Sequence, residues 1–346
     1  MQNVFSNRKI TISVLNWNSA EESLRCVDSV LTQDSSGFTV QLLVIDNGSA
    51  GPDWKLLEHG AEIRGVTVFR QNNNLGFAGG HNLSLRRALG DGTDFVWLIN
   101  SDAIVESGTL KQLIAVMDQD KTCGAVSPVI IGMHDAQHVD FCGAMHDWTN
   151  LDSTKPLIQD DALQLEKLRP FDMWVVGTAV LFRVGALNVV GLLDDRLFAY
   201  YEDDDICARL ASAGWCSRLA VNTRIKHSCY AGVVTARPPY YFYLMQRNYF
   251  TFWLAHTPTR FRKLIKLRLL DRSLYKVNGL YHRGFKKIGD AALLGLADAV
   301  FKRSGPPELS RSVPIIIRLL RIIFNIQHRR ALKKLDFEAG RTTGAD

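Results

Sequence analysis

Residues 200–215 read YYEDDDICARLASAGW, and the four carboxylates of Glu202–Asp205 stand where a helix should begin. Ile206 and Leu210 follow at helical spacing, and Gly214 can end the helix. Acidic side chains in a first turn offset the helix dipole, but this role explains one or two of the four. Because adjacent like charges repel, a cationic ligand or a proton to be accepted would balance the remainder. By itself the stretch fits helix capping and function about equally well.

The composition is that of a globular protein. The chain has 346 residues, 47% of them hydrophobic and 22% charged, enough for one large α/β domain and a smaller appendage. Its six cysteines show no CxxC spacing, which argues against a zinc site or redox dithiol and indicates the reduced thiols of a cytosolic protein. The N-terminus lacks a signal-peptide core, and no apolar run reaches roughly 18 residues, so no spanning helix is predicted.

The net charge of +6 conceals an asymmetry along the chain. Residues 1–239 carry 20 Lys and Arg against 28 Asp and Glu, whereas residues 240–346 carry 21 against 7. A basic C-terminal region weakly indicates nucleic acid or an anionic membrane as a partner. We therefore expect two domains, residues 1–239 and residues 240–346.

Short apolar runs alternate with helical patterns in the first hundred residues. Strands are expected at residues 10–15, 40–45, 66–69 and 95–99. Ser19 is a plausible N-cap for a first helix, and another helix is expected from about Asn82 to Leu89. This alternation predicts an α/β fold with a mostly parallel sheet flanked by helices. Polar residues follow the first, second and fourth strands, at the carboxyl edge where such sheets bind ligands.

The second half of the chain is less regular. Residues 132–170 are polar and are interpreted as an insertion or long loop near the site. Residues 174–183 and 218–225 are expected to be strands, the latter leading to His227. Helices are then expected at residues 240–256, 260–270 and 315–335. The last two alternate basic and apolar residues, which predicts a basic, amphipathic helical appendage.

Four features hold side chains suited to binding, and each has a structural alternative. Asp46, after the second strand, could accept hydrogen bonds from a nucleoside, but Asp-Asn-Gly is also good turn chemistry. The loop 74–82 has three glycines before a helix, where phosphate could bind, yet its spacing matches neither the Walker A nor the Rossmann pattern. Asp102 could bind a divalent cation or cap a helix. His227 is a candidate second ligand, although a lone histidine is more often structural.

These motifs occur in one order along the chain. They are Asp46-Asn47-Gly48-Ser49, Asn74-Leu75-Gly76-Phe77-Ala78-Gly79-Gly80-His81-Asn82, Asn100-Ser101-Asp102-Ala103 and Glu202-Asp203-Asp204-Asp205. Their combination, over about residues 10–256, resembles the inverting family 2 glycosyltransferases of the GT-A fold. The likeness is to rhamnosyltransferase-like members that build bacterial O-antigens and cell-wall glycans. It implies a nucleotide-diphospho-sugar donor and Mg²⁺ or Mn²⁺ as cofactor.

The resemblance also implies residue roles. The nucleotide-sugar would contact Asn16, Asn18, Asp46, Asn74, Gly76, Gly79, Asn82, Asn100 and Asp102. The metal ligands would be Asp102 and His227, and the acceptor side would be formed by Trp174, Gly177 and Glu202.

The catalytic base implied by the resemblance is Asp203, with Asp204 or Asp205 as alternatives because successive helical residues point about 100° apart. Asn100 departs from the family's DXD metal motif and removes one charge. A weaker or more readily exchanged metal is therefore consistent with this sequence.

The function expected from these features is transfer of a sugar, with L-rhamnose from dTDP-rhamnose as the first hypothesis. Galactofuranose, glucose or N-acetylglucosamine from a UDP-sugar are alternatives, as is a nucleotidyltransferase on the same fold. The acceptor would be a polyprenyl-linked glycan, so the enzyme is expected to be cytoplasmic and peripheral on the inner face of the plasma membrane. Homo-oligomerisation is an alternative use of the basic region. A non-enzymatic nucleic-acid-binding protein is also considered, but interleaved Ile and Leu favour lipid.

Overall fold

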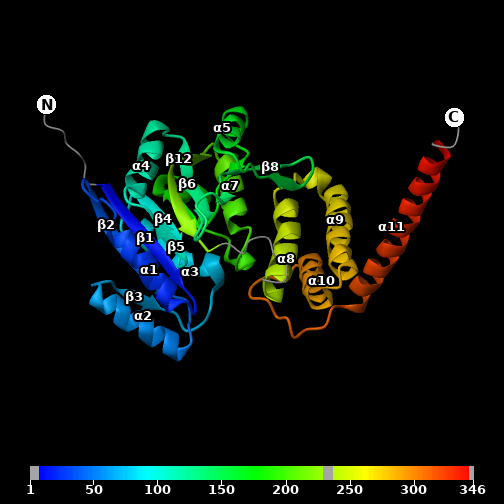
Figure 1. The fold of residues 1–346 in the computed structure, drawn as a ribbon, viewed down its shortest axis with the longest axis horizontal. Helices are drawn as coiled ribbons and strands as arrows, with labels where there is room; N and C mark the ends of the chain where they lie inside the picture. The colour runs from blue at the N-terminus through cyan, green and yellow to red at the C-terminus, as the bar shows by residue number, and fades with distance from the viewer. Residues whose placement is uncertain (1–7, 229–236, 343–346) are drawn as a thin grey trace. The chain divides into compact units, whose positions relative to one another are not determined.

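A computed structural model describes residues 8–228 and 237–342, with side chains to residue 328 (Figure 1). The chain divides into two compact units, Met1–Ala231 and Gly232–Asp346. Each has its own set of elements.

In unit 1, the described residues form a nine-stranded, mostly parallel sheet. Its strands are β1 (Arg8–Asn16), β2 (Phe38–Asp46), β3 (Val68–Arg70), β4 (Phe95–Asn100), β5 (Ala103–Val105), β6 (Cys123–Gly132), β7 (Val139–Phe141), β11 (Ala179–Arg183) and β12 (Cys216–His227). The order is β3-β2-β1-β4-β11-β6-β12-β5, with β7 paired to β6. β11 and β5 run antiparallel to their neighbours, whereas β3, β2, β1 and β4 are parallel, as are β6 and β12. The predicted α/β class is confirmed.

Helices cover this sheet because each buries an apolar side. They are α1 (Ala20–Leu31), α2 (Gly51–Ile63), α3 (Gly76–Gly90), α4 (Thr109–Gln119), α5 (Gln159–Leu168), α6 (Val184–Val190) and α7 (Glu202–Ser212), with a 3-10 turn at Asp195–Leu197. Leu24, Val27 and Val30 of α1 enter the core, as their spacing predicts. At the centre of the sheet, β4 buries Trp97 completely.

Some expectations about unit 1 were wrong. Residues 132–170 are not one irregular loop, because they contain β7, α5 and the strands β8 (Ala144–Asp147) and β9 (Asp152–Thr154). The expected strand 174–183 is broken: Met173–Trp174 (β10) joins β8 and β9 in a separate three-stranded sheet, and β11 starts only at Ala179. These strands are too short to show a clear period in the sequence.

Other elements begin or lie where the sequence did not indicate them. α3 starts at Gly76 rather than at about Asn82, because Gly76 enters the helix at φ 73° and lets the two following glycines continue it. β6 was not predicted, although every residue of it is buried. It contains Gly124 and Pro128, and the register with β12 shifts beside Pro128, which explains how a central strand accommodates a proline.

Unit 2 is helical in its described residues. It contains α8 (Pro239–Ala255), a 3-10 turn (Thr259–Phe261), α9 (Arg262–His282), α10 (Lys286–Val300) and α11 (Ile315–Thr342). α10 can lie close to α8 because residue 295 is a glycine. A Cβ atom at that position would collide with the backbone of Tyr243. Asp298 is buried and accepts hydrogen bonds from Tyr243 and Arg311, which balances its charge. Within the described parts of the chain, no helix is long and apolar enough to span a bilayer.

The cysteines of the described residues, Cys26, Cys123, Cys142, Cys207 and Cys216, are free and buried. Cys229 lies outside the described residues.

Candidate active site

Pairing brings the predicted residues to one edge of the sheet. Asn16 is in register with Asp46 at the ends of β1 and β2, and Leu15 is in register with Asn100 at the end of β4. β12 ends at the same edge with His227. Because β11 is antiparallel, the segment before Ala179 also meets this edge. Residues up to two hundred positions apart are thereby collected in one region.

Asn16 and Asp46 form a buried polar cluster. The Nδ2 group of Asn16 donates to Oδ1 of Asp46 at 3.0 Å, to Ser49 Oγ at 3.0 Å and to Oδ2 of Asp53 at 3.1 Å. Asp46 is fully buried, and Arg70 lies 3.5 Å from its Oδ2. Asp53 was not identified from the sequence because its place in the first turn of α2 is typical of a capping residue.

Asn18 holds the turn that leads into α2. It is exposed at φ 53°, and its Oδ1 accepts a hydrogen bond from the backbone N–H of Ala50 at 2.8 Å. The neighbouring Trp17 is 46% exposed. A planar aromatic face is therefore available beside the polar cluster.

The glycine-rich loop is fixed by Asn47, a residue whose side chain the sequence did not single out. Its Nδ2 donates to Oδ1 of Asn74 and to the carbonyl of Gly76, both at 3.0 Å, and its Oδ1 accepts from the N–H of Leu75 at 2.9 Å. Asn74 Oδ1 also accepts from the N–H of Gly76 at 2.7 Å. A side chain at Gly76 would collide with the carbonyl of Phe198, so only glycine fits there.

Two further residues of this loop have structural contacts. Asn82 is buried, donates to the carbonyl of Leu193 at 2.9 Å and accepts from its N–H at 3.1 Å. A Cβ atom at Gly79 would lie 2.9 Å from the Cβ of Leu75. The hydrogen bonds of Asn82 hold α3 to the segment before α7. A role in donor binding for Asn82 or Gly79 stays a prediction.

Asp102 and His227 lie together, as predicted. His227 Nε2 is 3.3 Å from Asp102 Oδ1 and 3.5 Å from Asn100 Nδ2. Their proximity follows from the antiparallel pairing of β12 with β5, which puts His227 opposite Ala103. A second acidic residue, Asp140, lies 3.7 Å from His227 Nδ1. Asp140 comes from the segment interpreted as a loop, and no motif in the sequence pointed to it.

The charge of His227 responds to these two carboxylates. Burial alone would lower the pKa of His227, but hydrogen bonding and attraction to Asp102 and Asp140 outweigh it and raise the pKa to about 9. Carboxylate and imidazole donors suit Mn²⁺ and related divalent ions, so this donor set fits a metal. Because a ligating imidazole must be neutral, metal binding here is linked to proton release.

The four acids at the start of α7 have different surroundings. Asp205 pairs with Arg209 at 2.8 Å, and Asp204 Oδ1 lies 3.1 Å from Nε2 of the buried His146. Glu202 is buried, and burial together with the charge of Asp203 raises its pKa well above the usual value. Asp203 is the one of the four that is not buried. The tertiary structure thus separates a solvent-accessible acid from three enclosed ones.

Two backbone hydrogen bonds orient the carboxylate of Asp203. Its Oδ2 accepts from the N–H of Gly177 at 3.0 Å, and its Oδ1 accepts from the N–H of Asp204 at 3.0 Å. Asp203 is still partly enclosed, and this partial burial and the charge of Asp204 raise its pKa to about 6, although these hydrogen bonds and Lys155 act in the opposite direction. A carboxylate that is ionised at neutral pH but more basic than usual is suited to accept a proton.

The chain before α7 has an unusual backbone. Phe198, Tyr200 and Tyr201 all have positive φ angles, between 67° and 73°. Residues other than glycine rarely adopt this conformation, and it persists where surrounding contacts enforce it. The carbonyl of Phe198 accepts a hydrogen bond from Ala78, which links this turn to the glycine-rich loop.

Of the predicted acceptor-side residues, Gly177 contacts Asp203 and Glu202 precedes it in α7. A Cβ atom at Gly177 would lie 2.9 Å from the ring of Phe77, so glycine permits the close approach of Phe77. Trp174 is buried, stacks on His146 at 6.1 Å, and has an indole N–H without a partner in the described residues. The ammonium group of Lys155 lies 5.1 Å from the Trp174 ring. His146 is in β8, and Lys155 directly follows β9. Neither residue was identified from the sequence.

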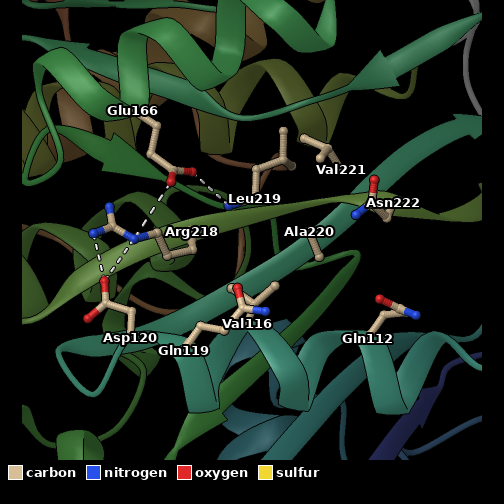
Figure 2. A pocket seen from close by; sticks show the side chains of 10 residues that line it. All are labelled: Gln112, Val116, Gln119, Asp120, Glu166, Arg218, Leu219, Ala220, Val221 and Asn222. Carbon is tan, nitrogen blue, oxygen red and sulfur yellow. Dashed lines mark hydrogen bonds and ion pairs between the residues drawn. The ribbon is translucent and has the colours of Figure 1, made fainter.

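A pocket of about 290 Å³ lies elsewhere in unit 1, between α4, β12 and the end of α5 (Figure 2). Its lining includes Arg218, which pairs with Asp120 at 2.7 Å and lies 3.6 Å from Glu166. The single cationic side chain among the described residues of this lining is therefore already engaged by two carboxyl groups. None of the predicted site residues lines this pocket, so the polar strand ends remain the candidate active site.

Comparisons with known proteins bear on this geometry. The family model described as glycosyl transferase family 2 matches residues 11–161. This part of the chain is therefore similar to that family. A galactofuranosyltransferase, GlfT1 of Mycolicibacterium smegmatis, is 27% identical over 206 residues, which cover 59% of this chain and 65% of the relative. An N-acetylglucosaminyl-diphospho-decaprenol L-rhamnosyltransferase of Mycobacterium tuberculosis is 27% identical over 221 residues, or 54% of this chain and 66% of the relative. The chain thus spans just under two thirds of the length of each.

Solved structures show the fold of this chain. The fragment 1-349 of S. aureus TarS superposes with a TM-score of 0.53 at 17% identity, covering 84% of this chain and 81% of the fragment. The mannosyltransferase PcManGT from Pyrobaculum calidifontis, solved with GDP-Man and Mn²⁺, gives a TM-score of 0.51 at 16% identity, covering 96% of this chain and 88% of the other. The expected GT-A fold is therefore confirmed.

Proposed function

We propose that this protein is an inverting, metal-dependent glycosyltransferase of family 2. The observation that carries the proposal is the arrangement of Asp203, an accessible carboxylate with a raised pKa, held by Gly177 at the sheet edge where Asp46 ends β2 and Asp102 follows β4. Ligands of open α/β sheets bind at this edge. A base on one side and a nucleotide-binding edge on the other are the parts that sugar transfer needs.

In the proposed reaction the donor is a nucleotide-diphospho-sugar. The polar cluster of Asn16 and Asp46 would recognise the nucleoside, and the exposed Trp17 offers a face for the base. Asp203 would accept the proton of an acceptor hydroxyl, whose oxygen attacks the anomeric carbon opposite the leaving group and inverts it.

The residues that would hold Mg²⁺ or Mn²⁺ are Asp102 and His227, with Asp140 as an additional candidate. When bound, the ion supplies positive charge that stabilises the departing diphosphate. The support is the donor set itself, together with a structural neighbour solved with Mn²⁺. Within the described residues no group of three or more His, Cys, Asp or Glu has ligating geometry, so the proposal includes a small movement of these side chains.

The proposed acceptor is a lipid-linked glycan, and the first sugar hypothesis is L-rhamnose from dTDP-rhamnose. One relative's name gives a diphospho-decaprenol acceptor and L-rhamnose, which supports both. Galactofuranose is the second candidate, because a galactofuranosyltransferase matches at the same 27% identity. A lipid-linked acceptor also supports residence of the enzyme at the inner face of the plasma membrane.

The test is nucleotide release from a panel of dTDP- and UDP-sugars, with Mg²⁺ or Mn²⁺ and a bacterial lipid-linked glycan extract. We expect release from one donor, dependent on metal and acceptor, and its loss in Asp203→Asn. Nucleotide binding, measured separately by calorimetry, is expected in both proteins. Absence of both binding and release for every donor would refute the assignment.

A further inference from the structure

The inward side of α11 holds both apolar and polar side chains. Ile317 is buried, at 2% exposed. Arg321 of α11 donates to Oδ1 of Asn278 at 3.2 Å and lies 4.1 Å from the ring of Tyr281, both on α9. Asn325 lies 3.2 Å from His282 of the same helix. In most helices of globular proteins the apolar side faces the neighbouring elements, whereas most of the described aliphatic side chains of α11 do not.

The opposite side of α11 is an exposed aliphatic surface, which we call the outer face. Its members are Ile315, Ile316, Leu319, Leu320, Ile322, Ile323 and Ile326, each between 36% and 73% exposed. At 100° per residue they fall within an arc of about 160°. A contiguous apolar surface of this kind on a soluble protein marks a place where something binds.

The charge around the outer face selects the class of partner. From Leu309 to Leu335 the sequence has seven Arg or Lys and no Asp or Glu. At the start of α9, four basic residues are exposed, and they alternate with Leu264 and Leu267, each 66% exposed. The four are Arg262, Lys263, Lys266 and Arg268. A pair of helices that combines an aliphatic face with unbroken positive charge is complementary to an anionic lipid surface.

A second copy of the chain fits these observations less well. Helices that pair with one another usually carry both signs of charge beside the apolar seam. Here two copies would bring together two segments of like charge, which repel. No acidic residue of α11 before Asp336 could offset this repulsion.

We infer that the outer face of α11, with the basic start of α9, docks on the surface of an anionic phospholipid bilayer. α11 lies in the plane of the interface, with its aliphatic side chains among the acyl chains and the exposed Arg318, beside the outer face, at the phosphates. The inference deepens the proposed function, since it names the surface that would bring the enzyme to a lipid-linked acceptor. It rests on α9 and α11 and not on the strand-end residues.

The test is flotation of the full chain with vesicles of phosphatidylcholine, with or without phosphatidylglycerol. We expect binding to the anionic vesicles, weakened several-fold at high salt. The paired substitution Ile316→Glu and Ile323→Glu is expected to lower the affinity for anionic vesicles at least about tenfold, because it puts two charges on the side of α11 that enters the bilayer. The matched control is Ile63→Glu, on an isoleucine of α2 that is 71% exposed, and its affinity should match the wild type.

Three results would overturn the inference. The first is wild-type protein that floats with neither vesicle, and the second is a double variant that binds as the wild type does. The third is a lipid-free dimer that the double variant converts to a monomer, which would make the outer face a subunit interface. Donor binding, measured by calorimetry on all three proteins, reports on the strand-end site separately. Failure of the wild-type protein to float, with its donor binding intact, would therefore refute only the docking surface.

Discussion

At the residue scale, Asp203 differs from its acidic neighbours through its partners. Asp204 and Asp205 each face a basic side chain, His146 and Arg209, whereas Asp203 is held by backbone N–H groups and reaches solvent. These surroundings favour Asp203 over Asp204 and Asp205, and we propose Asp203 as the catalytic base.

We expect Asp203→Asn to lower kcat by about 10²- to 10⁴-fold, because an amide cannot accept the acceptor's proton. Nucleotide affinity should change little, since Asp203 is not part of the Asn16–Asp46 cluster. Steady-state kinetics with calorimetry for the donor would check both. Equal activity in the variant would move the base to a neighbour.

The raised pKa of Asp203 predicts a pH dependence of activity. With a pKa of about 6, the carboxylate is mostly ionised at pH 7 and mostly protonated at pH 5. Only the ionised form is a base, so kcat/KM should fall about tenfold per pH unit below 6. A pH–rate profile between pH 4.5 and 8, at saturating metal, measures this; a flat profile across pH 6 would contradict the assignment.

The metal assignment is also tested at single residues. Replacing Asp102 with Asn removes a charged oxygen next to His227, so the Mn²⁺ concentration for half-maximal activity should rise at least about tenfold. Asp140→Asn should have a smaller effect if Asp140 acts mainly by orienting His227. Titration of activity with Mn²⁺ in the two variants distinguishes these roles. If the Mn²⁺ concentration for half-maximal activity is unchanged in Asp102→Asn, Asp102 is not a metal ligand.

At the element scale, the start of α3 is determined by one glycine. Gly76 combines a positive φ with contact against the carbonyl of Phe198, and Asn47 fastens the same loop. The segment that carries the strained residues before α7 is thus connected to the loop that precedes α3. The loop before α3, on the proposed donor side, is therefore connected to the segment before α7, which leads to the proposed base.

Gly76→Ala should therefore destabilise the protein by about 3 kcal/mol or more, from a strained φ plus a steric clash. The matched control is Gly92→Ala, which also has a positive φ, 64°, but open space around it. We expect that control to cost only about 1–2 kcal/mol. Chemical denaturation of both variants gives the difference, and equal losses would mean that the contact with Phe198 does not constrain the loop.

At the scale of the whole molecule, binding and docking are assigned to different units. All predicted donor-site residues belong to unit 1, and the outer face of α11 belongs to unit 2. The opposite charge of the two parts of the sequence is consistent with two kinds of partner.

This separation predicts where a donor nucleotide protects the backbone. With nucleotide and Mn²⁺ present, hydrogen exchange should slow at the strand ends near Asn16 and Asp46 and in the loop 74–82. Exchange in α8–α11 should be unchanged. Mass spectrometry of peptides from the full chain provides the measurement. Protection confined to the pocket near Arg218 would place the nucleotide there instead.

The sequence by itself determined the class of fold and the order of its motifs. Apolar runs such as those before Asn16 and Asp46 become strands because their period and flanking turn residues are local properties. The acidic start of α7 and its end near Gly214 are local for the same reason.

Only the tertiary structure decided which residues meet. His227 reaches Asp102 because β12 pairs with β5, and Asp140 joins them from a segment without a clear sequence period. Burial of three acids left Asp203 accessible, and the packing of the opposite side of α11 against α9 left most of its aliphatic side chains exposed. These outcomes depend on contacts between residues far apart in the chain, and hydrophobic periodicity within one segment carries no information about such contacts.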